Sequence, residues 1–117
     1  MKDPDSAQEW MGATVFAGAA LEALLLCGLK QRESSEDGRR RLDLLDLAQF
    51  IDRAKAEGLI DEATASQARL AKDARNLIHP GRSARLGVSC DRGTALTALA
   101  GLDRVAADLA RIHAKTG

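Results

Sequence analysis

An arginine and a histidine stand four positions apart in the segment Arg75-Asn76-Leu77-Ile78-His79-Pro80-Gly81-Arg82. If the chain is helical up to His79, this spacing places both side chains on nearly the same side of the helix. A histidine can move protons to or from a 2′-hydroxyl or a leaving oxygen. A guanidinium can stabilise charge on phosphoryl oxygens. The pair Arg75 and His79 is therefore a candidate for cleaving a phosphodiester without a metal.

The same residues have a purely structural interpretation. Arginine and asparagine side chains near the carboxyl end of a helix often bind its exposed carbonyls, and His79 can act as a cap. Spacing alone leaves both interpretations open. Three further arginines, Arg82, Arg85 and Arg92, can hold a phosphate backbone, and binding through such contacts should weaken steeply with salt.

Four principal helices are predicted to position these groups. A segment from Ser6 to about Lys30 is apolar nearly all round, so we expect a buried helix at the centre of the domain. A second helix is predicted over 42–57, with Gly58 as its carboxyl-terminal cap. A third is predicted from a cap at Asp61 to His79-Pro80, and a last one after a cap at Asp91 or Thr94. Their apolar stripes contain, in the second helix, Leu44, Leu45, Leu47, Ala48, Ile51 and Ala54 and, in the third, Leu70, Ala74, Leu77 and Ile78.

The chain as a whole is predicted to be one all-α domain over residues 1–117. Residues 31–41 carry no apolar periodicity and are predicted to be a flexible loop, and no stretch alternates like a strand. The length of 117 residues suits one domain, and 45% apolar with 29% charged residues is typical of a globular protein. We expect a bundle of four principal helices with antiparallel neighbours.

Composition restricts the possible functions. Seventeen basic residues balance seventeen acidic ones, so no overall field attracts polyanions. Aromatic residues make up 3% of the chain, too few for a base-stacking platform. No cofactor motif is present, and two His and two Cys at positions 27, 79, 90 and 113 are too scattered for a zinc site, so we expect neither cofactor nor metal.

Cysteine usage and the first residues favour a cytoplasmic protein. Two cysteines make no disulfide framework, and the N-terminus shows charges and a proline where a signal peptide would be apolar. Cys27 is expected in the core, and Cys90 as an ordinary thiol rather than a nucleophile. Residues 10–29 have the length of a membrane span, but Glu22 lies near their middle. The amphipathic helices that follow need an apolar partner, which favours a buried core helix and no membrane.

Two segments together carry a resemblance to a known family. AGAALEALLL in the first predicted helix and DARNLIHPGR at the end of the third resemble the HEPN superfamily. Its members are small helical-bundle domains, mostly of prokaryotes, that are common in toxin–antitoxin and phage-defence systems. The resemblance covers the order of all four predicted helices, and the motifs that carry it are short.

The resemblance implies a homodimer in which the arginine–histidine motifs of two subunits face each other across a cleft. In active family members that cleft is a metal-independent ribonuclease site. Arg75 and His79 would be its catalytic pair, and Asn76 the polar residue that commonly follows the arginine. Glu22 matches the acidic position of the pattern G-x-x-L-E-x-L-L, which runs from Gly18 to Leu25.

The acidic residue of this pattern needs a partner, because a lone carboxylate in an apolar helix is costly to bury. Arg75 is the partner that we expect for Glu22. The chain departs from the family in one respect: three residues separate Arg75 from His79, where active members usually have four to six.

Two functional hypotheses follow from the resemblance. The first is an RNA-directed endoribonuclease of a toxin–antitoxin or phage-defence type, with a possible cognate protein partner. The second is a non-catalytic module that dimerises or docks a partner, in which Glu22, Arg75 and Asn76 form a structural network.

Overall fold

The computed structural model describes residues 5–76 and 92–116, and within these ranges the chain is helical with no strand. The all-α class predicted from the sequence is confirmed. The described residues form four longer helices and one short one: α1 (Asp5–Arg32), α2 (Glu36–Leu42), α3 (Leu47–Ala56), α4 (Glu62–Asn76) and α6 (Arg92–Thr116).

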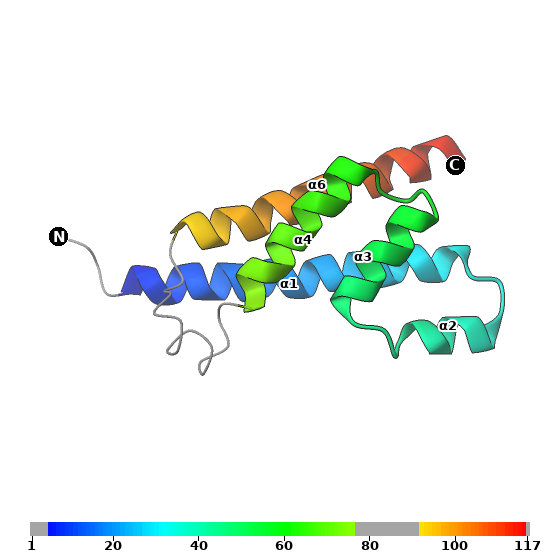
Figure 1. The fold of residues 1–117 in the computed structure, drawn as a ribbon, viewed down its shortest axis with the longest axis horizontal. Coiled ribbons are helices and arrows are strands. Elements are labelled where there is room, and N and C mark those ends of the chain that lie inside the picture. The colour runs from blue at the N-terminus through cyan, green and yellow to red at the C-terminus, as the bar shows by residue number, and fades with distance from the viewer. Residues whose placement is uncertain (1–4, 77–91, 117) are drawn as a thin grey trace.

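The two longest helices, α1 and α6, lie alongside each other and run in the same direction (Figure 1). The helix α4 runs back across both of them, and α3 crosses α1 beside it. The expectation of antiparallel neighbours therefore holds for α4 against its two partners and is wrong for the pair α1 and α6.

The predicted loop over 31–41 is wrong in part, because α2 occupies its second half. Ser35 caps this helix by accepting a hydrogen bond from the backbone N–H of Gly38 at 2.9 Å. Acidic residues fill its first turn and basic residues its last, which suits the helix dipole. Leu42 is its only buried residue, so there is no apolar periodicity from which the helix could be predicted.

The second predicted helix begins five residues later than expected, at Leu47. A capping box sets this start: Asp46 Oδ1 accepts from the Gln49 N–H, and Gln49 Oε1 accepts from the Asp46 N–H, both at 2.9 Å. Leu44 precedes the box and is 83% exposed, so its predicted place in the apolar stripe is wrong. Leu47, Ile51 and Ala54 of that stripe are buried as predicted.

The turn between α3 and α4 has the chemistry that the sequence indicates. Gly58 takes a φ of 77°, a left-handed conformation that glycine adopts without a steric cost. The N–H of Leu59 then reaches the carbonyl of Ala54 at 2.9 Å, which closes a Schellman motif. Asp61 caps α4 as predicted, with its Oδ1 accepting from the Thr64 N–H at 2.7 Å.

The helix α4 packs through small residues. Its buried positions are Thr64, Ala65, Ala68, Ala71 and Ala74. Leu70, predicted for the buried stripe, is instead 50% exposed, because the alanine face turns it outward. Alanines allow close approach to α6, where a methyl group on Gly101 would lie 2.6 Å from Ala71 Cβ. The predicted cap Thr94 lies inside α6, and Asp91, Leu77 and Ile78 lie outside the described residues.

Only one side of α1 is buried. Leu21, Leu25 and Leu29 are at most 1% exposed and meet α3, α4 and α6 in the core. On other sides Met11 is 42%, Val15 47% and Phe16 69% exposed. The expectation of a fully buried central helix is therefore half right. Residues Glu9–Arg32 of α1 are long and apolar enough to cross a membrane, a test that core helices of soluble proteins also pass.

Candidate functional site

The predicted partners Glu22 and Arg75 form an ion pair between α1 and the carboxyl end of α4. Figure 1 shows this end of α4 crossing α1. Arg75 Nη1 donates to Glu22 Oε2 at 2.9 Å across 53 positions of sequence. The two side chains are 32% and 42% exposed, respectively. An ion pair with this much solvent access contributes about 0.2–1 kcal/mol to stability.

Gly18 makes this geometry possible. It lies one helical turn before Glu22 on α1, and the aliphatic stem of Arg75 runs directly over it. A methyl group at position 18 would collide with Arg75 Cδ and lie 2.9 Å from its Cγ. Gly18 therefore leaves room for the stem of Arg75, while Glu22 holds its guanidinium.

The position of Arg75 on α4 follows from how this helix begins and packs. Asp61 fixes the first turn, and the buried alanines hold the helix against α1 and α6. Arg75 directly follows the last of them, Ala74, so its stem leaves the buried face at the border with α1. Asn76 is half-buried and is the last described residue of α4.

The described residues do not test whether the other predicted site residues lie near this pair. His79, Arg82 and Arg85 lie outside the described residues, as does Cys90. Arg92 is the first residue of α6 and is exposed. Cys27, predicted to be in the core, is exposed on α1, which corrects that expectation.

A second polar cluster, at the far end of α4, was not predicted. Asp108 of α6 is only 5% exposed, and its Oδ2 accepts from the Asp61 N–H at 3.2 Å. Its Oδ1 pairs with Arg111. The spacing of Asp108 and Arg111 on one helix face was visible in the sequence, but its contact with the start of α4, 47 positions away, was not.

Within residues 5–76 and 92–116, no three His, Cys, Asp or Glu side chains are placed to hold a metal ion together. The chemistry that the described site offers is a guanidinium, held by a carboxylate and partly open to solvent. It can bind an anion or brace two helices.

No family model matches the sequence, and no curated protein or solved structure is significantly similar to the chain. The resemblance to the HEPN superfamily therefore depends on the two motifs alone.

Proposed function

We propose that this protein is a HEPN-like interaction module that acts as a cytoplasmic homodimer, with Glu22 and Arg75 as an internal brace. The observation that supports dimerisation is the uncovered apolar face of α1. Phe16 is 69% exposed, and Gly12, Ala19 and Ala23 follow the same side of the helix at intervals of three and four residues. Exposed apolar patches of this kind mark interaction sites.

A second copy suits this face because it carries one large side chain among small ones. In an antiparallel pair of α1 helices related by a two-fold axis, Phe16 of each copy would pack over the small residues of the other. Such an interface is self-complementary, as a symmetric dimer requires. The face carries no charged residue between Gly12 and Ala23, since Glu22 lies at its edge and is paired with Arg75.

Light scattering coupled to gel filtration tests the dimer. We expect the wild type to be a dimer and Phe16→Glu to be a monomer with an unchanged circular dichroism spectrum. Leu44→Glu is the matched control, because Leu44 is more exposed, at 83%, but lies outside α1. A monomeric wild type at about 100 μM, or a Phe16→Glu variant that still dimerises, contradicts the proposal.

The second candidate function is metal-independent cleavage of RNA by Arg75 and His79. The observation that favours it is the exposure of Arg75, whose side chain keeps about a third of its surface in solvent. A guanidinium has five N–H donors, so pairing with one carboxylate oxygen leaves donors for a phosphate.

Incubation with a mixed single-stranded RNA pool in EDTA tests this second function. Cleavage products with cyclic-phosphate ends are expected from the wild type and not from His79→Ala. His113→Ala is the control, since it removes the other histidine of the chain. Equal inactivity of the well-folded wild type and His79→Ala protein would leave the interaction module as the function.

A further inference from the structure

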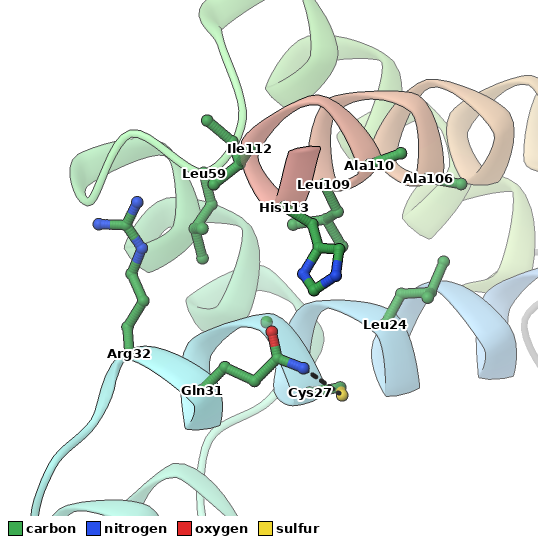
Figure 2. Close-up of a pocket in the computed structure, with 11 residues that line it drawn as sticks. Leu24, Cys27, Gln31, Arg32, Leu59, Ala106, Leu109, Ala110, Ile112 and His113 are labelled. Carbon is green, nitrogen blue, oxygen red and sulfur yellow. Dashed lines mark hydrogen bonds between the residues drawn. The ribbon is translucent and has the colours of Figure 1, made fainter. Parts of the chain in front are cut away.

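A groove separates the carboxyl-terminal parts of α1 and α6 (Figure 2). Its volume is about 760 Å³, within the range of about 300–1,000 Å³ that is typical of small-molecule sites. Its walls are mainly aliphatic. The apolar lining consists of Leu24 and Gly28 from α1, Leu59 from the α3–α4 turn, and Ala106, Leu109, Ala110 and Ile112 from α6.

The polar side chains of the groove are mostly hydrogen-bond donors. Arg32 and Gln31 line it from α1 and His113 from α6, and no lining residue is acidic. Figure 2 shows the His113 ring pointing towards α1, above Gln31 and Cys27, with Arg32 at the end of the groove near Leu59. A guanidinium only donates, and it has five N–H donors. The groove therefore offers more donors than acceptors.

Arg32 carries the one permanent full charge among the lining side chains. The carboxyl ends of α1 and α6 each add a partial negative charge of about half a unit at this end of the groove, which weakens the attraction for an anion but leaves the guanidinium donors in place. Arg32 Nη1 donates to the Glu57 carbonyl at 3.4 Å, a long contact that leaves its other donors for a ligand. The head group that best matches these donors is an anionic one, because it accepts charge-assisted hydrogen bonds.

We propose that this groove binds a small organic acid with an apolar body. The body would lie against Leu24, Leu59 and Leu109, and the carboxylate would face the guanidinium of Arg32. This site uses neither the Glu22–Arg75 pair nor the Phe16 face of α1. Its test is therefore independent of the test of the function proposed above.

Cys27 provides a local readout, because its exposed thiol lines the groove. In the full-length protein with Cys90→Ser, the rate at which methyl methanethiosulfonate modifies Cys27 is measured with three probes of one shape. They are 3-phenylpropanoate, 3-phenylpropanol and 3-phenylpropylammonium, which share a phenyl ring on a three-carbon chain and carry an anionic, a neutral and a cationic head group. An acid of this size is expected to bind with a Kd on the order of 1 mM. About 10 mM should then slow the modification about tenfold.

We expect the acid to protect Cys27, the alcohol to protect it less and the ammonium ion least. Arg32→Gln should reduce protection by the acid to that by the alcohol. Ala106→Phe should abolish protection by filling the groove, whereas Ala107→Phe, at an exposed neighbour outside the lining, should retain it. Light scattering in the same samples checks that the probes leave the oligomeric state unchanged. Absence of protection, equal protection by all three probes, or an unchanged response in Arg32→Gln overturns the proposal.

Discussion

Replacement of Gly18 by alanine is the sharpest test of the contact between α1 and α4. In an ordinary helix interior this change stabilises a protein by about 1 kcal/mol, because glycine is a poor helix former. Here the new methyl group would occupy the space of the Arg75 stem. Displacing that stem costs about 1–3 kcal/mol of overpacking and breaks an ion pair worth about 0.2–1 kcal/mol. The gain of about 1 kcal/mol in helix propensity offsets part of this cost. We therefore expect Gly18→Ala to lower the free energy of unfolding by about 0.5–2 kcal/mol, in the lower part of the net range because the arginine is flexible.

The sign of the effect should reverse when Arg75 is truncated. In an Arg75→Ala background only the Cβ of residue 75 remains near the new methyl group, at 3.3 Å, which a small shift can relieve. Gly18→Ala should then stabilise the protein by up to about 1 kcal/mol. The coupling between the two positions is therefore expected to be about 1–3 kcal/mol, as for residues in direct contact.

Urea denaturation followed by circular dichroism, at one protein concentration, gives the four free energies of unfolding for this cycle. All proteins of the cycle carry Phe16→Glu, which removes the proposed α1 interface. Gly12→Ala in this background is the matched control, because nothing lies within 4 Å of a methyl group there. It should stabilise the protein by about 1 kcal/mol in both backgrounds. If Gly18→Ala has the same effect with and without the Arg75 side chain, the stem does not lie over Gly18 and the reasoning fails.

Three further outcomes test the rest of the fold. Gly101→Ala should destabilise the protein by about 1–3 kcal/mol, since its methyl group would meet Ala71 Cβ at 2.6 Å between two rigid helices; an unchanged thermal midpoint would contradict the close packing of α4 and α6. Asp108→Ala should lower the free energy of unfolding in urea by about 1–3 kcal/mol, because the Asp61 N–H loses its acceptor. An unchanged free energy of unfolding would show that the contact of Asp108 with the start of α4 does not stabilise the fold. The hydrogen bond from the Thr64 backbone N–H lowers the pKa of Asp61 below its ordinary value of 3.8. The contribution of the Asp61 carboxylate to stability is therefore complete above pH 3.8 and is lost as the pH falls further. Asp61→Asn keeps a hydrogen-bond acceptor at the cap but does not titrate. When the free energy of unfolding is measured against pH below 3.8, it should fall less steeply for Asp61→Asn than for the wild type, and equal slopes would contradict this role of Asp61.

Local chemistry explains which parts of the fold were predictable from the sequence. The Gly58 turn and the Asp61 cap depend on a few consecutive residues, so their types alone predict them. The pair of Glu22 and Arg75 was predictable for a different reason. A single carboxylate in an apolar helix requires a partner, and the resemblance indicated which residue it is.

The errors arose where tertiary packing or charge outweighed apolar periodicity. The short helix α2 is held by a cap and by charges that match its dipole, so its sequence resembles a solvated loop. Leucine is larger and more apolar than alanine, so apolar periodicity alone predicts Leu70 in the core. In the structure α4 lies so close to its neighbours that the side with the small alanine side chains is buried and Leu70 faces solvent. The distance between the helices determines which side is buried, and the sequence of α4 does not give that distance.

The uncovered side of α1 was unpredictable for a related reason. A helix that is apolar all round is normally buried, and the sequence does not show whether its own domain has enough helices to cover it. Here α3, α4 and α6 cover one side, and Phe16 stays in solvent. In the homodimer proposed above, a second copy of the chain would cover the other side, and the apolar pattern of one chain does not show whether such a copy is present.

The charge balance at Arg75 explains why the interaction module is preferred to the ribonuclease. Glu22 and Arg75 together are neutral, so an approaching phosphate meets the carboxylate as well as the guanidinium. In a solvated site each of these opposed interactions amounts to about 1 kcal/mol at 4 Å, and their sum gives little net attraction. Catalysis would therefore require further positive charge at the same place, from His79 or from a second copy of the chain. Bracing two helices requires nothing beyond the contacts that Glu22, Gly18 and Arg75 already make.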